Sequence, residues 1–269
     1  MAIPPPFQAE PPGEPPTAPP ASDPPEKISV IRAVKFLLSD REHRKANWPY
    51  AALLSIIPVV GRITLMGWQA EAAQRLVRRH PTPLPKFDFK DLTHYLLRGL
   101  VPFLVEYLAV LPIPFLWFVF MMIGTVPIEG ARAAGYDDLR LILLIVWMLA
   151  GWCLFFGYQL VFVNAILIRA ELSADFGQTL KLGAVFRYAA KTWKRSFGYG
   201  LLLGVISVGL TLCGFAALYV GVYFALPLIS FGSMHLRYQI YAAYLREGGE
   251  PIPLKEPQPL PSESAVPGH

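Results

Sequence analysis

Charge and cysteine are what this sequence has least of. Only 16% of its 269 residues are charged and 54% are hydrophobic, whereas a soluble globular chain carries about 25% charged residues. Its two cysteines, Cys153 and Cys213, both lie inside apolar runs, so a disulfide framework is not expected. The shortage of charge predicts an integral membrane protein.

Motifs that carry chemistry are also missing. The sequence contains no HExxH, no glycine-rich phosphate loop and no nucleophile elbow, and its 5 histidines are scattered. A metal site would need thiol or imidazole ligands in close pairs. We therefore predict no catalytic residues, no metal, no cofactor and no enzymatic activity. The net charge of +5 fits loops facing anionic lipid, so no nucleic-acid partner is expected.

Both ends of the chain are polar and rich in proline. Residues 1–26 contain acids but no lysine or arginine, and such a segment cannot bury a core. We predict a disordered tail there, either a spacer or a ligand for a proline-binding module, and a second disordered tail over 248–269. An N-terminal signal peptide is not expected, because a basic region followed by an apolar one is missing. Residues 27–247 form a single helical membrane domain.

Four stretches of this domain predict membrane spans, at 99–125, 140–168, 198–213 and 216–236. The last two come from one run of 39 uncharged residues, about 58 Å as a helix, close to twice the hydrocarbon thickness. A tight turn is therefore expected near Cys213 to Ala217. Amphipathic segments between the runs predict interfacial helices. The fold class is an all-α, polytopic membrane helical bundle.

The stretch 48–68 is the ambiguous one. From Trp48 to Gly61 it offers 14 largely apolar residues, about 21 Å of helix against a hydrocarbon core of about 30 Å, and Pro58 and Arg62 interrupt it. Lysine and arginine are abundant on both sides of it, with six in 27–45 and six in 75–98, but only two in 126–140. The positive-inside rule favours a re-entrant hairpin, four spans and both termini on the cytoplasmic side of the inner membrane. A fifth span stays open as the alternative.

Three polar residues fall within or beside apolar runs. Glu106 sits inside a predicted span, where a carboxylate marks either a proton or cation relay or a structural ion pair. Arg62 is its expected partner, with a lipid phosphate as the alternative. Asn164 predicts a hydrogen bond between helices.

Two further groups of residues suggest contacts. A basic and aromatic group predicts binding of anionic headgroups, although it is also an ordinary topology signal: Lys191, Trp193, Lys194 and Arg195. A stripe of small residues predicts close helix packing, within the chain or between chains: Gly200, Gly204 and Ser207.

Several short motifs point to a family. They are Ile57-Pro-Val-Val-Gly61, Gly67-Trp-Gln, Leu84-Pro-Lys-Phe-Asp-Phe89 with Asp91, Gly99-Leu100 and Leu226-Pro-Leu. With them, the chain resembles the bacterial and archaeal domain-of-unknown-function family 4013 from about Ile28 to Arg246. The resemblance implies a multi-pass membrane protein and supplies no catalytic residues.

Two functions are compatible with these features. The first is a non-catalytic scaffold or interaction protein that organises the cytoplasmic membrane. Its expected partners are membrane lipids, further copies of the chain or another membrane protein. The alternative is a transporter or channel subunit that uses an intramembrane pair of Arg62 and Glu106.

Overall fold

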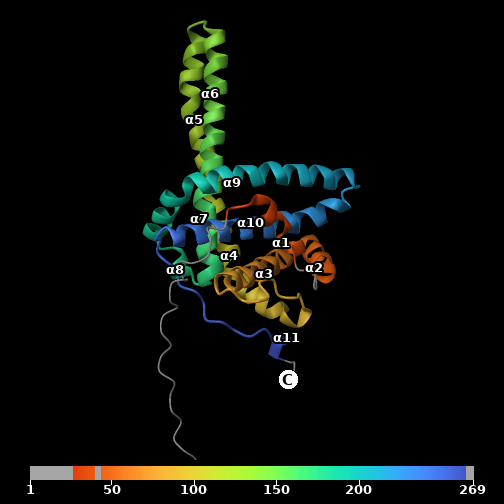
Figure 1. Cartoon of the computed structure of the whole chain (residues 1–269). Coiled ribbons are helices and arrows are strands. Elements are labelled where there is room, and N and C mark those ends of the chain that lie inside the picture. The colour runs from red at the N-terminus through yellow and green to blue at the C-terminus, as the bar shows by residue number, and fades with distance from the viewer. Residues whose placement is uncertain (1–26, 40–43, 265–269) are drawn as a thin grey trace, which may run out of the picture.

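The computed structural model describes residues 27–39 and 44–264. Within these ranges the chain forms helices and no strand, which confirms the predicted all-α class. The predicted tail over 1–26 lies outside the described residues. The helices form a body from which one long hairpin projects (Figure 1).

The ambiguous stretch folds as two helices, α2 (Arg44–Ile56) and α3 (Val60–Val77), joined by a turn at residues 57–59. The start of α2 is tied to the segment after α3: Asn47 Nδ2 donates to the Pro85 carbonyl (3.4 Å), and Phe87 N donates to Asn47 Oδ1 (2.9 Å). These hydrogen bonds place the start of α2 beside the segment that follows α3, so the stretch turns back on itself. It is a helical hairpin, packed with α1 (Val30–Ser39) against the rest of the body.

The motif glycines let helices in the body touch. A Cβ on Gly61 would lie 1.9 Å from the Leu54 carbonyl oxygen, so α2 and α3 meet backbone to backbone. After the short 3-10 helix η1 (Phe89–Asp91), α4 (Leu92–Val110) crosses α3 where Gly67 faces Gly99. Trp68, fully buried, donates to the Pro85 carbonyl at 3.2 Å. The motifs therefore join α2, α3 and α4 into one packed unit.

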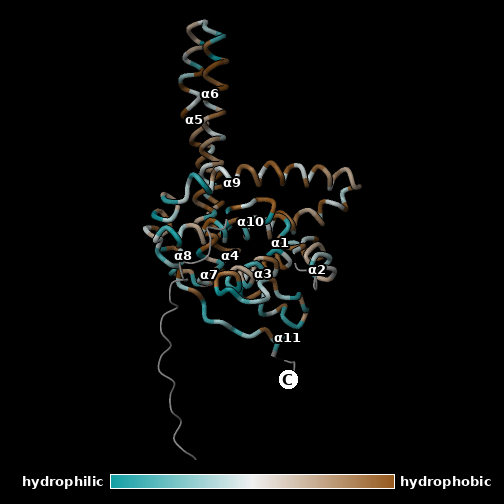
Figure 2. The backbone as a smooth tube through the Cα atoms, viewed as in Figure 1, coloured by the Kyte–Doolittle hydropathy of each residue, from teal (hydrophilic) through white to brown (hydrophobic). Residues whose placement is uncertain are grey.

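The projecting hairpin consists of α5 (Pro112–Ala133) and α6 (Asp137–Gly157). Pro112 separates α5 from α4, since proline cannot continue the hydrogen-bond ladder of a helix. Trp147 stacks on Phe120 with ring centroids 4.4 Å apart and fills the space beside Gly124. Outside this seam the large apolar side chains are exposed, so the hairpin has little contact with the body. Figure 2 shows both helices coloured hydrophobic over much of their length.

From α6 the chain returns to the body through a π-helical stretch, η2 (Tyr158–Val163), and then α7 (Asn164–Ser173) and α8 (Phe176–Thr179). Two long helices follow, α9 (Leu182–Ala216) and α10 (Val220–Arg246), joined by a turn at residues 217–219. Gly214 and Gly221 pack directly against each other beside this turn. The pair α9–α10 runs crosswise to the pair α5–α6 (Figure 1).

Three helical segments among the described residues are long and apolar enough to cross a membrane: Phe89–Ala133, Asp137–Ser173 and Leu182–Ala216. They contain the spans predicted at 99–125, 140–168 and 198–213. The stretch predicted as a span at 216–236 falls in α10, which is not among them. The second half of α10 instead buries polar side chains against the body, including His235, Arg237 and Gln239.

The prediction of a disordered tail over 248–269 is corrected for residues 248–264. Ile252 and Leu260 are buried, Lys255 N donates to the Leu172 carbonyl (3.0 Å), and the short helix α11 (Pro261–Ser264) follows. Composition suggested disorder because prolines and acids dominate the segment, but its three large aliphatic side chains, Ile252, Leu254 and Leu260, pack against the body. Residues 265–269 lie outside the described residues.

Candidate functional site

Arg62 and Glu106 form the ion pair that their positions predicted. Arg62 Nη2 lies 2.8 Å from Glu106 Oε1 and 3.0 Å from Oε2 and joins α3 to α4. The side chains are 44% and 24% exposed, and Glu106 is six residues before Pro112, where the projecting hairpin begins. The pair therefore lies at the base of the hairpin and does not line a cavity within it.

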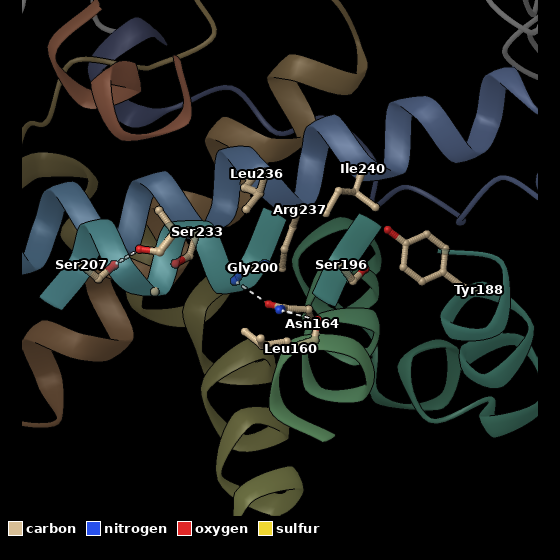
Figure 3. A pocket seen from close by; sticks show the side chains of 12 residues that line it. Leu160, Asn164, Tyr188, Ser196, Gly200, Ser207, Ser233, Leu236, Arg237 and Ile240 are labelled. Atoms are coloured by element: carbon tan, nitrogen blue, oxygen red, sulfur yellow. Dashed lines mark hydrogen bonds between the residues drawn. The ribbon is translucent and has the colours of Figure 1, made fainter. Parts of the chain in front are cut away.

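Asn164 and the predicted small-residue stripe meet at a cavity of about 140 Å³ between η2, α9 and α10. Figure 3 shows Asn164 facing Arg237, which comes from α10. The lining combines hydroxyls and aliphatic groups: Leu160, Tyr188, Ser196, Gly200, Leu203, Gly204, Ser207, Ser233, Leu236 and Ile240.

A buried ion pair lies beside this cavity. Arg237 bonds to Glu171 on α7, with Nη2 on Oε1 and Nε 3.4 Å from Oε2, and its Nη1 lies 3.4 Å from Asn164 Oδ1. Glu171 is 1% exposed and Arg237 is 8% exposed. The sequence holds one signal for this pair, because Arg237 is the residue that ends the uncharged run of 39.

Most polar groups of the cavity are already bonded within the chain. Ser207 Oγ donates to the Leu203 carbonyl (2.8 Å), and Asn164 Nδ2 donates to the Leu160 carbonyl (2.9 Å). Gly200 packs closely against Leu160, whereas a Cβ on Gly204 would meet open space. The cavity can therefore hold a few water molecules, but it presents no nucleophile paired with a base.

A second charged cluster lies between α3 and α4. Glu71 is bound by Arg75 Nε (2.8 Å) and by Arg98 Nη1 (2.9 Å), with His94 Nε2 3.7 Å away. Burial raises the pKa of Glu71, but His94 and the two arginines outweigh burial and lower that pKa to about 2. Glu71 is thus an ionised buried carboxylate. Nothing in the sequence singles Glu71 out, because Glu71, Arg75 and Arg98 resemble an ordinary solvated helix face.

The residues predicted to contact anionic lipid lie along the first half of α9. Trp193 is exposed, and Lys194 Nζ lies 5.7 Å from the centre of its ring. Lys191 lies over the Tyr244 ring, 5.8 Å from its centre. Arg195 is held by Glu247 at the end of α10. Lys191 and Lys194 therefore keep their charges available at the surface, and Arg195 has an internal partner.

The family model for "Protein of unknown function (DUF4013)" matches residues 50–220, more than half of the chain. The chain belongs to this family. No curated protein and no solved structure matches this chain. The DUF4013 match covers α3 to α9, so it includes the ion pair of Arg62 and Glu106, the charged cluster around Glu71 and the lysines of α9.

Side chains of the types that bind metals are scattered in the part of this DUF4013 chain that the structure describes. Over residues 27–39 and 44–264, no group of three or more His, Cys, Asp or Glu side chains could hold a metal ion. Cys153 and Cys213 are both free and exposed. The polar sites described above are ion pairs and the cavity beside Asn164, and a second hollow of about 420 Å³ lies between the start of α9 and the C-terminal segment, lined by Arg169, Arg187 and Glu250 among others.

Proposed function

We propose that the protein is a non-catalytic integral membrane protein that organises the cytoplasmic membrane. In this proposal α5–α6 crosses the bilayer and α9–α10 lies along its surface. The observation that carries the proposal is the crosswise arrangement of these two apolar hairpins (Figure 1). Two hairpins that cross cannot both stand along the normal of a flat bilayer.

The hairpin α5–α6 has the length and surface of a membrane anchor. Its helices have 22 and 21 residues, about 33 and 32 Å, close to the hydrocarbon thickness of about 30 Å. Large apolar side chains are exposed all along it, for example Phe115, Ile123 and Leu149. Its distal end carries Asp137, Asp138 and Arg140, which suit the water on the far side of the membrane.

The hairpin α9–α10 has the surface of an element lying in the interface. Leu201, Val205, Val208 and Leu212 follow helical spacing on α9, and all four are exposed. The other side of α9 contacts α10 and η2. An apolar hairpin pressed into one leaflet displaces lipid on that side only, which is a physical route to shaping a membrane.

Charge supports the orientation and the lipid partners. The basic segments 75–98 and 169–195 and the described residues 27–39 belong to the body or lie beside it, and the hairpin end is poor in lysine and arginine. We therefore place the body and both termini in the cytoplasm. Lys191, Trp193 and Lys194 then contact anionic headgroups, and the exposed flanks of α5–α6 are available for self-association or for a partner helix.

The proposal predicts that Val208→Asp abolishes a shaping effect on vesicles. We expect the protein, reconstituted into phosphatidylglycerol-containing liposomes, to reduce the mean vesicle diameter, as measured by cryo-electron microscopy. A carboxylate at Val208, 61% exposed on the apolar stripe, would keep α9 out of the acyl layer. The matched control is Thr82→Asp, which adds the same charge on an exposed loop of the body. Unchanged diameters with the wild-type protein would contradict the proposal.

A transporter or channel subunit is the second candidate. It is favoured by the pair of Arg62 and Glu106, whose Glu106 lies on the helix that precedes the anchor, and by the buried pair of Glu171 and Arg237. Ion or proton flux through the same liposomes, lost on Glu106→Gln, would support this candidate. The position of the pair at the base of the hairpin favours a headgroup-level salt bridge instead.

A further inference from the structure

The charged cluster between α3 and α4 has more positive than negative charge of its own. Arg75 and Arg98 both bind the single carboxylate of Glu71. Arg75 is 6% exposed and Arg98 is 2% exposed. A buried charge is stable only when it is paired, so the two helices alone leave one positive charge without a counterion.

The guanidinium groups also have unused donors. Among the described residues, Arg75 Nη1, Arg98 Nε and Arg98 Nη2 are buried and have no hydrogen-bond partner. The Tyr95 hydroxyl on α4 has no partner either, and neither do two acceptor oxygens on α3, Glu71 Oε2 and Gln74 Oε1. His94 Nε2 lies 3.7 Å from Glu71 Oε2. Buried donors without partners are costly, and so many in one place indicate a site that accepts an anion.

The C-terminal segment supplies an anion to this site. Glu263 on α11 places both carboxylate oxygens 2.9 Å from Arg75 Nη2. Leu260, 1% exposed, anchors the segment, and Ser262 donates from N (2.9 Å) and from Oγ (2.5 Å) to Asp91. The carboxylate of Glu263 uses only one of the available guanidinium nitrogens and is itself 48% exposed. It is a tethered ligand that fills the site in part.

We infer that the cluster of Arg75, Arg98 and His94 is a binding site for a phosphate-class oxyanion, and that Glu263 is its internal competitor. A phosphate offers more acceptor oxygens than a carboxylate and matches the planar fork of arginine. Glu71 opposes a second anion by charge, while also holding the two arginines in place. Release of α11 would open the site to free phosphate or to a phosphate-bearing headgroup.

The test is the binding of inorganic phosphate by the purified full chain in detergent, measured by isothermal titration calorimetry. We expect Glu263→Gln to bind phosphate at least tenfold more tightly than the wild-type protein, because the tethered carboxylate no longer competes. Glu250→Gln is the matched control: Glu250 belongs to the same segment but pairs with Arg187 on α9 (2.9 Å). It should leave phosphate affinity unchanged.

Arg75→Lys in the Glu263→Gln background keeps the positive charge but removes the planar guanidinium group. It should abolish the increase in phosphate affinity. Circular dichroism and gel filtration establish that each variant is folded. Nanodiscs containing phosphatidic acid distinguish the two sources of phosphate. If Glu263→Gln retains this lipid and inorganic phosphate displaces it, the ligand is a headgroup. If Glu263→Gln binds only free phosphate, the ligand is soluble. If Glu263→Gln binds phosphate no more tightly than Glu250→Gln, the inference is wrong.

Discussion

Replacing Gly99 with alanine should separate α3 from α4 and lower the stability of the whole body. A Cβ at Gly99 would lie 1.9 Å from the Ile63 carbonyl oxygen and 2.7 Å from Gly67 N. Backbone atoms cannot move aside as a flexible side chain can, so the helices themselves must shift. Overpacking in a well-packed core costs about 1–3 kcal/mol and occasionally more. We expect the free energy of unfolding to fall by about 3 kcal/mol and Tm in detergent to fall by roughly 10 °C, as measured by circular dichroism.

The control for this prediction is Gly209→Ala on α9. Gly209 is also inside a helix, but an added Cβ meets nothing within 4 Å. Alanine is favoured over glycine in a helix by about 1 kcal/mol, so Tm should stay the same or rise. Equal Tm values for the wild-type protein and Gly99→Ala would show that the crossing of α3 and α4 is looser than described.

Glu71→Gln is expected to have the other large effect. Glutamine has nearly the same shape but no charge, so Arg98, 2% exposed, would lose its ionic partner. Removing one partner of a buried ion pair costs about 3–5 kcal/mol. Glu250→Gln, which breaks an exposed pair with Arg187, should have no measurable effect on Tm.

The same carboxylate predicts how stability depends on pH. Its pKa is lowered from 4.5 to about 2 in the folded chain, so its stabilising contribution is fully present above pH 4.5. That contribution is lost as the pH falls from 4.5 toward 2, because the unfolded chain takes up the proton first. Glu71→Gln should flatten this part of the curve of Tm against pH. An unchanged slope would mean that Glu71 is not the ionised centre of the cluster.

The sequence predicted the helical class, and it predicted the pairing of Arg62 with Glu106. Both depend on local signals: long apolar runs give helices, and a lone carboxylate beside a lone arginine needs a partner. The turn expected near Cys213 to Ala217 lies at residues 217–219, beside the close contact of Gly214 with Gly221. The family motifs were also visible, although their role in packing α2, α3 and α4 was not.

What the sequence could not supply is the direction of each helix in space. The crossing of the two hairpins depends on how α10 packs against α1 and α3, a contact between segments far apart in the chain. The cluster of Glu71, Arg98 and Glu263 likewise brings together α3, α4 and α11. Each of these residues, taken singly, is indistinguishable from a solvated surface charge, and Glu263 lies in a stretch whose composition is typical of disorder.

The most direct test of the account is the membrane sidedness of three engineered cysteines, placed singly at Lys86, Ala134 and Leu218 in a chain with Cys153 and Cys213 replaced by alanine. A membrane-impermeant thiol reagent, applied to intact cells and to inverted vesicles, reports the face of each site. We predict that Ala134, at the end of α5–α6, is labelled only from the outside, and that neither Lys86 nor Leu218 is. Labelling of Ala134 from the same face as Lys86 would contradict the proposal that α5–α6 spans the membrane. Labelling of Leu218 from the same face as Ala134 would contradict the proposal that α9–α10 lies on the membrane surface.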